Sequence, residues 1–165
     1  DKLCYKKYLP NGVIMSFGNN PFNETSHTGY EFLSLPRTVY KLKDEEIRLI
    51  KSGWEHNCVI SRENKLFVWG NNDSGQCGVS HNKVIHNPSQ IETLDNVFDV
   101  GCGNEHSVCT AYTNSNNVSL KAFSWGKSEG GVLGYIQQKI EYFPKEIKGF
   151  PSDPKEIINS KDKET

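Results

Sequence analysis

Two histidines occupy the same place in two copies of a short motif, Gly53-x-x-His56 and Gly103-x-x-His106. An imidazole can bind a metal ion or transfer a proton near neutral pH, so both residues are candidates for chemistry. A catalytic group is needed only once, however, whereas a structural corner is needed in every copy of a repeated unit. We therefore expect a structural role, in which a ring nitrogen of each histidine bonds to a turn carbonyl.

The cysteines are a second group that could bind a metal ion, and there are five of them: Cys4, Cys58, Cys77, Cys102 and Cys109. Their number is odd, and no pair has the C-x-x-C spacing of a zinc-binding turn. Three of them lie within or at the ends of apolar runs. We expect reduced, buried thiols that pack as small apolar groups, with no metal site and no bound cofactor.

The segment Gly70–Gly78, with the sequence GNNDSGQCG, has two glycines spaced as in a phosphate-binding loop. No Lys-Ser or Lys-Thr pair follows it, and no helical pattern follows it either. No Ser/His/Asp or Cys/His set stands in the context of a known catalytic motif. We therefore expect a chain reversal here rather than a phosphate site, and we predict no catalytic residues and no covalent enzymatic chemistry.

The charge balance argues against a dedicated nucleic-acid binder, since 19 basic and 20 acidic residues leave a net charge of −1 over 165 residues. No run of about 18 apolar residues is present to cross a membrane. The first residues, DKLCYKKYLPNG, lack the apolar core of a signal peptide. Unless the N-terminus has been trimmed, we expect an intracellular protein, nuclear or cytoplasmic, without a membrane partner.

The elements that would position these residues are short strands. Cys58–Ser61 and Lys65–Trp69 are rich in β-branched and aromatic residues, which suit a half-buried sheet. The polar Arg62–Asn64 between them has the length of a hairpin turn. Glu46–Lys51 is predicted to form a further strand. Long helical periodicity is absent from the sequence, so we predict an all-β fold.

The predicted hairpin belongs to a unit that occurs three times. Aromatic-glycine pairs and prolines mark the copies in constant order, about 50–56 residues apart: Phe17–Gly18, Trp69–Gly70 and Trp125–Gly126, then Pro36, Pro88 and Pro144. Each unit holds a corner, a hairpin, a Gly-rich turn, a variable loop and two further strands, which is the content of one propeller blade. The units cover approximately residues 1–52, 53–102 and 103–160, followed by a tail at 161–165.

Three such units are too few to close a propeller, since four to eight blades are typical. The two unpaired blade faces would expose large apolar patches to water. We expect the remaining blades to come from the same polypeptide or from self-association of the chain.

The order Gly-x-x-His, strand, Trp-Gly-x-Asn, Ser-Gly-Gln-x-Gly, Pro, strand resembles the repeat of the regulator of chromosome condensation family. The resemblance is strongest over Gly53–Gly103; the third unit matches as GNEHSVCTA, KAFSWGKSEGGVLG and FPKEI, and the first only as GVIMSFGNN and LPRTV. The resemblance implies β-propeller blades of four antiparallel strands in a seven-bladed propeller, of which this chain would supply about three.

The resemblance also implies function. Family members act as interaction modules in ubiquitin ligases, ciliary proteins and kinases, and the founder is a guanine-nucleotide exchange factor for the GTPase Ran that also sits on nucleosomes. No segment here matches the exchange wedge of the founder, and the tail Lys155–Thr165 is mixed in charge. We predict a protein–protein interaction scaffold; the alternative is an exchange factor for a small Ran-like or other Ras-like GTPase.

One plant member of the family senses UV-B light through a repeated Gly-Trp-Arg-His-Thr corner. In this chain Glu55 replaces the arginine, and Asn104 stands where the next tryptophan would be. These departures argue against light sensing.

The candidate partner-binding residues are those that the repeat itself does not require. They come from the corner after Gly53 and from the variable loops Val79–Asn87 and Thr113–Ser119, because binding residues concentrate on loops held by a rigid scaffold. The predicted residues are Trp54, Glu55, His81, Asn82, Lys83 and Asn116.

Overall fold

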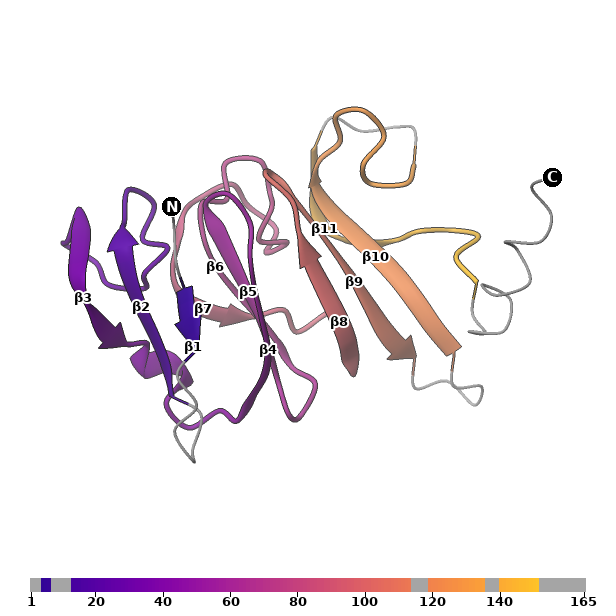
Figure 1. The fold of residues 1–165 in the computed structure, drawn as a ribbon. Helices are drawn as coiled ribbons and strands as arrows, with labels where there is room; N and C mark the ends of the chain where they lie inside the picture. The colour runs from indigo at the N-terminus through magenta and orange to yellow at the C-terminus, as the bar shows by residue number, and fades with distance from the viewer. Residues whose placement is uncertain (1–3, 7–12, 114–118, 136–139, 152–165) are drawn as a thin grey trace, which may run out of the picture.

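The structure of the chain, a computed structural model, describes residues 4–6, 13–113, 119–135 and 140–151 (Figure 1). The described residues form three antiparallel sheets that follow one another along the chain. The first sheet contains β1 (Cys4–Lys6), β2 (Ile14–Asn19) and β3 (Phe32–Thr38). The second contains β4 (Ile47–Ser52), β5 (His56–Ser61), β6 (Leu66–Gly70) and β7 (Ile85–Gln90). The third contains β8 (Val97–Cys102), β9 (His106–Thr113), β10 (Ser119–Lys127) and β11 (Ile140–Glu146).

Every sheet is a meander, in which each strand pairs with its neighbour in sequence. This order confirms the predicted all-β fold and the blades of antiparallel strands, four in each of the second and third sheets. The only helix among the described residues is η1 (Tyr40–Leu42), a single 3-10 turn between the first and second sheets. No helix in this part of the chain has the length and apolar character needed to cross a membrane.

The sheets are offset by one strand from the repeated sequence units. The strand that closes the first unit, β4, pairs with β5 of the second sheet, and β8 likewise pairs with β9. The repeated Gly-x-x-His corner is therefore the turn between the first two strands of one sheet. The closing strand expected at the end of the third unit would fall after residue 151, outside the described residues.

The aromatic-glycine pair produces the same irregularity in each sheet. The register shifts between Ser16 and Gly18, between Val68 and Gly70, and between Ser124 and Gly126. The three glycines have φ of 108°, 110° and 101°, a region that side chains disfavour. Such a bulge bends the strand and re-aims the aromatic ring beside it. The repeated motif thus fixes where each sheet turns its tryptophan or phenylalanine.

Two hydrophobic cores lie between consecutive sheets. The first lies between the first and second sheets and includes two residues of the segment that connects them, Val39 and Leu42; its other members are Ile14, Ile47, Val59, Phe67 and Trp69. The second joins the second and third sheets: Cys58, Ile60, Leu66, Val68, Cys77, Ile91, Leu94, Val97, Val100, Cys109, Ala111 and Trp125. Alternate residues of β5 supply both cores, because Val59 faces one side of the sheet and its neighbours Cys58 and Ile60 face the other. The second sheet is therefore covered on both faces, and all of β5 and β6 is buried.

Candidate interaction face

The turns at one end of the three sheets form what we call the loop face: segments 20–31, 53–55, 71–84, 103–105 and 128–135. In the two four-stranded sheets, the turn after the first strand and the turn after the third strand lie at the same end. In the first sheet, β2 carries the aromatic-glycine pair as β6 does, so the turn after β2 corresponds to the turn after β6. The short turn 62–65 between β5 and β6 lies at the opposite end. Figure 1 shows the loops gathered above the sheets.

The Gly-x-x-His corners are closed by main-chain hydrogen bonds. The amide of Gly53 donates to the oxygen of His56 at 2.8 Å, and that of Gly103 donates to His106 at 2.9 Å. A Cβ on Gly53 would lie 2.5 Å from the oxygen of Gly103, so only glycine fits between the neighbouring corners. The two corners therefore pack against each other at the start of adjacent sheets.

His56 is buried and hydrogen-bonded, as expected for a structural role, but its hydrogen-bond partner is not the predicted one. The ring is buried, but its Nε2 lies 2.9 Å from the hydroxyl oxygen of Ser107 in the third sheet, not from a turn carbonyl. Because the Ser107 hydroxyl donates to the oxygen of Gln76 at 2.9 Å, His56 is the donor in this bond. The imidazole thus joins two sheets, and its Nδ1 has no partner among the described atoms.

A second contact between sheets is repeated at both boundaries. The indole N–H of Trp69 donates to the oxygen of Glu24, and that of Trp125 donates to the oxygen of Gln76. Each oxygen accepts a further bond from the residue after the corner histidine, Asn57 at the first boundary and Ser107 at the second. At each boundary, these bonds hold a segment of the loop face against the following sheet, which restrains the position of that segment.

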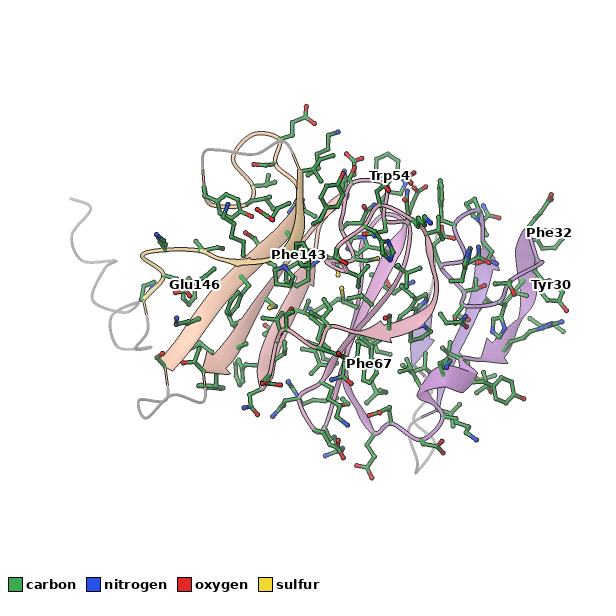
Figure 2. All side chains as sticks on the ribbon, turned by 180° about the vertical axis from the view of Figure 1, so that it is seen from behind. Tyr30, Phe32, Trp54, Phe67, Phe143 and Glu146 are labelled. Atoms are coloured by element: carbon green, nitrogen blue, oxygen red, sulfur yellow. The ribbon has the colours of Figure 1, made fainter. Side chains whose placement is uncertain are left out.

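The predicted residues of the corner lie on this face. Trp54 is 61% exposed, the fourth most exposed of the large hydrophobic side chains that the structure describes (Figure 2). Glu55 accepts a hydrogen bond from the side chain of Asn71 at 2.9 Å, and its main-chain oxygen accepts from the Asn71 amide at 2.7 Å. The corner that presents Trp54 is therefore held from the neighbouring turn.

The predicted residues of the second loop lie at the same end. His81, Asn82 and Lys83 are all exposed. The side chain of Asn72 donates to the oxygen of His81, and the Lys83 amide donates to Nδ1 of His81 at 3.2 Å. The structure thus brings the corner and the loop to one face through neighbouring residues of the turn after β6. Asn116, in the segment between β9 and β10, lies outside the described residues.

Most main-chain N–H groups of the Gly-rich segment after β6 already make hydrogen bonds within the protein. The amides of Asn71, Asp73, Ser74, Gly75, Cys77 and Gly78 all donate to acceptors within the segment or on the adjacent corner. A phosphate-binding loop needs such amides free to point at the ligand. A Cβ on Gly78 would lie 2.8 Å from Nε1 of Trp125, so this segment is packing surface for the next sheet.

The hollow beside Trp54 is small. It has a volume of about 30 Å³ and lies between the first and second sheets, where Phe17, Asn19 and Thr25 face the corner 53–57. A pocket for a drug-sized molecule has roughly 300–1,000 Å³. Two larger hollows, of about 730 and 460 Å³, are lined by the turn after β2 and by β3, away from the predicted residues.

The part of the loop face formed by the third sheet is charged. Lys127 pairs with Glu105 at 2.8 Å and with Glu129 at 3.2 Å, and Ser74 donates to Glu105 at 3.1 Å. The hydrogen bond from Lys127 is the main cause that lowers the pKa of Glu105. A charged rim beside an exposed tryptophan is typical of protein interfaces.

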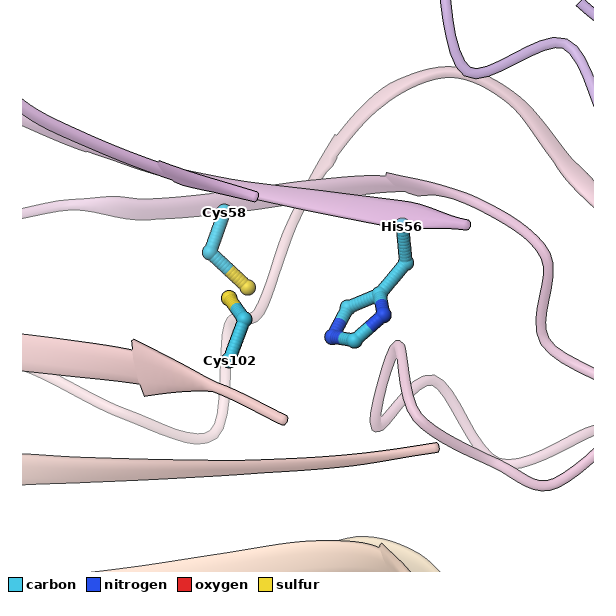
Figure 3. Close-up of side chains that lie close together, drawn as sticks. All are labelled: His56, Cys58 and Cys102. Atoms are coloured by element: carbon cyan, nitrogen blue, oxygen red, sulfur yellow. The ribbon is translucent and has the colours of Figure 1, made fainter. Parts of the chain in front are cut away.

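One cluster of side chains was missed by the sequence analysis. His56, Cys58 and Cys102 bring their ligand-type atoms within 4.8 Å of one another, and Figure 3 shows both sulfurs on the side of the imidazole that carries Nε2. The interaction between the two thiols is the main cause that raises the pKa of Cys58 and lowers that of Cys102. Two features of the sequence could have indicated this cluster. His56 lies two residues before Cys58, the first residue of a predicted strand, and Cys102 directly precedes a repeated glycine.

Comparisons with known proteins show which family has this repeat. The family described as "Regulator of chromosome condensation (RCC1) repeat" matches residues 63–110, and a second description of the same repeat matches residues 47–76. The Ultraviolet-B receptor UVR8 of Arabidopsis thaliana is 31% identical over 144 residues, which cover 86% of this chain and 31% of the receptor. The human protein called Probable E3 ubiquitin-protein ligase HERC6 is 30% identical over 129 residues, which cover 76% of this chain and 12% of that protein.

Solved structures share the fold. Yeast RCC1 (Prp20), solved bound to Kap60, superposes with a TM-score of 0.71 at 22% identity, over 83% of this chain and 33% of that chain. Human WBSCR16 superposes with a TM-score of 0.67 at 24% identity, over 87% and 37%. This chain thus spans between 12% and 37% of the length of each of these relatives. It consists of β-propeller blades and belongs to the regulator of chromosome condensation (RCC1) repeat family.

Proposed function

We propose that this chain provides three consecutive blades of a propeller that binds protein partners through its loop face. The observation that carries the proposal is Trp54, a large aromatic side chain 61% exposed on a corner that main-chain and side-chain bonds hold in place. Tryptophan is enriched among the residues that dominate binding energy at interfaces. A preorganised aromatic anchor loses little conformational entropy on binding.

The other exposed groups of the loop face fit the rim of such an interface. His81, Asn82 and Lys83 supply polar groups on one side, and the Lys127 cluster supplies both signs of charge on the other. We propose that this face acts without covalent chemistry, since binding by an exposed aromatic residue and a polar rim requires none.

The first and third sheets, at the two ends of the row, also expose apolar residues. At one end, Tyr30 and Phe32 are 46% and 63% exposed (Figure 2); on the third sheet, Val132 in the turn after β10 is 44% exposed. Val132 precedes Leu133, whose oxygen accepts from Ser124, just as Glu24 precedes Thr25, whose oxygen accepts from Ser16. The carbonyl of Val132 is thus in position to receive the tryptophan of a following blade. We propose that further blades, from the same polypeptide or from a second copy, cover both ends.

A photo-crosslinking experiment tests the proposal. A photoreactive amino acid replaces Trp54 in the complete polypeptide within cells, and the matched control carries it at Glu63, an exposed residue in the turn at the opposite end of the second sheet. We expect one or more defined protein adducts from position 54 and none of these from position 63. Identical adducts from both positions, or none from position 54, would refute a binding role for the loop face.

A second candidate function is nucleotide exchange on a small GTPase. The structure of Prp20p from Saccharomyces cerevisiae, described together with its binding to Gsp1p and histones, shares the fold with a TM-score of 0.70 at 22% identity. The test is the release of a labelled guanine nucleotide from Ran-like and other Ras-like GTPases in the presence of the complete polypeptide. Accelerated release would establish this function, and unchanged release from every GTPase tested would leave the scaffold alone.

A further inference from the structure

The cluster of His56, Cys58 and Cys102 lies at the boundary between the second and third sheets. His56 and Cys58 are two residues apart on β5, so both side chains leave the same face of the strand. Cys102 is the last residue of β8 in the next sheet. The exposed fractions of His56 and Cys58 are 1% and 0%, and Cys102 is partly buried. Three groups that can bind a soft metal thus converge from two separate elements on one shielded place.

The spacing and the chemical type of these three ligand atoms indicate that the ion is zinc. Zinc takes cysteine sulfur at about 2.3 Å and histidine nitrogen at about 2.0–2.1 Å, so two ligands of one tetrahedral ion lie roughly 3.4–3.8 Å apart. The ligand atoms here lie within 4.8 Å of one another, which small side-chain rotations reduce to that range. Two thiolates balance the charge of Zn²⁺, and a neutral site suits a buried position. Oxygen-seeking ions such as Mg²⁺ and Ca²⁺ do not suit sulfur ligands.

The state of the imidazole is compatible with binding. In the structure Nε2 donates to Ser107, while Nδ1 is buried and has no hydrogen-bond partner among the described atoms. The proton can therefore move to Nδ1, where no existing bond is broken, and the bond from Nε2 to Ser107 is exchanged for the bond to the metal. Nε2, on the side of the two sulfurs in Figure 3, then becomes a ligand. The Ser107 oxygen lies 2.9 Å from Nε2 and 4.0 Å from the Cys58 sulfur, so a further polar atom lies beside the three ligand-type groups.

We propose that His56, Cys58 and Cys102 form a zinc site that fastens the second blade to the third. Zinc binding replaces the protons of both thiols and releases them to solvent. The ion joins β5 to β8 directly, beside the hydrogen bonds of Trp125 and Ser107 to Gln76. The site is structural, and it holds in register the two corners that carry Trp54 and Glu105 on the loop face.

The first test is metal binding by the reduced chain. The protein is stripped of metal in the presence of a phosphine reductant and titrated with Co²⁺, whose spectrum reports its ligands. We expect one ion per chain, a thiolate-to-cobalt charge-transfer band, visible bands of tetrahedral intensity, and displacement of Co²⁺ by Zn²⁺. Absence of the charge-transfer band would overturn the proposal without any variant. A disulfide between Cys58 and Cys102 that persists in the reductant would also overturn it.

The second test assigns the ligands. Cys58→Ala and Cys102→Ala should each lower the affinity for Zn²⁺ by at least a hundredfold, whereas Cys109→Ala should leave it unchanged. Cys109 is the matched control, because it is a buried free thiol of the same core outside the cluster. Unchanged affinity in both ligand variants would refute the site.

A third measurement does not depend on the folding of variants. In the wild-type chain, Zn²⁺ should slow alkylation of Cys58 and Cys102 by at least tenfold and leave the rate at Cys109 unchanged, as read by mass spectrometry. Equal rates at all three thiols with and without Zn²⁺ would contradict the proposal.

Discussion

Trp125 donates its indole N–H to the main-chain oxygen of Gln76 at 2.8 Å, across the boundary between the second and third sheets. Trp69 makes the same bond to Glu24 at 2.7 Å, across the boundary between the first and second sheets. Both rings are fully buried. The two tryptophans thus join the end of a strand in one blade to the loop face of the preceding blade, so packing and loop position depend on the same side chain.

Replacement of Trp69 by alanine should lower the free energy of unfolding by about 3–5 kcal/mol, because it leaves a large cavity in the first core. Trp69→Phe keeps an aromatic ring and removes the N–H, so it should cost less. The measurement is urea unfolding followed by circular dichroism. Trp54→Ala is the matched control on an exposed tryptophan and should change stability by less than about 0.5 kcal/mol. A loss below about 1 kcal/mol for Trp69→Ala would contradict its place in the core.

Gly70→Ala should destabilise the chain by more than about 2 kcal/mol, since φ is 110° and the new Cβ would lie 2.8 Å from the Cα of His56 and closer still to the oxygen of Glu55. Gly130→Ala is the control, because φ is 67° and no atom lies within 4 Å of the new Cβ. It should cost only the backbone strain of about 1 kcal/mol. Equal losses in urea unfolding would show that the close approach of the corner to β6 does not matter.

The arrangement of the strands was open to prediction because it repeats. The residues of each aromatic-glycine pair meet the same local requirement in each sheet, namely a bulge with a glycine at positive φ. A local requirement leaves its mark on sequence at a fixed position, and three copies reveal it. The exposure of Trp54 was predictable for the complementary reason, since a large residue outside the repeat has no place in the shared core.

The contacts between sheets were not predictable in this way. His56 meets Ser107, a residue 51 positions away, and Cys58 meets Cys102. Each pair depends on the angle between two packed sheets, and no spacing within one unit encodes that angle. The repeat argument also weighed against chemistry at His56, because equivalent histidines were expected to have equivalent surroundings. The surroundings differ: the residue two positions after His56 is a cysteine, whereas Val108 follows His106 at the same distance.

Stability should depend on His27 as the pH falls. Burial is the main cause that lowers the pKa of His27, and its Nε2 has no hydrogen-bond partner among the described atoms. A bond with the backbone of Arg37 partly offsets the effect of burial, and the charge of Arg37 adds to it. Since the folded chain resists protonation that the unfolded chain accepts, this contribution is complete above about pH 6.5 and declines as the pH falls through the lowered folded value.

The comparison that isolates this effect uses His27→Gln, which cannot be protonated. Urea unfolding at about pH 7.5 and about pH 5 should show a larger loss of stability in the wild-type chain than in the variant. Equal losses in both proteins would mean that His27 titrates alike in the folded and unfolded chains. A larger loss in the variant would reverse the sign and contradict a lowered pKa of the partly buried His27 ring.

The exposed aromatic residue Phe32, at one end of the row of sheets, should drive self-association of the chain when no further blades are present. Phe32 on β3 is 63% exposed, and burial of such a side chain contributes roughly 1.5–3 kcal/mol. Phe32→Ser should therefore raise the dissociation constant of the association by about tenfold or more, as measured by sedimentation velocity over a range of concentrations. Trp54→Ser, which removes an equally exposed aromatic ring from the loop face, should leave that constant unchanged. A chain that stays monomeric at all concentrations, or one that loses association only with Trp54→Ser, would show that this end is not a surface that further blades cover.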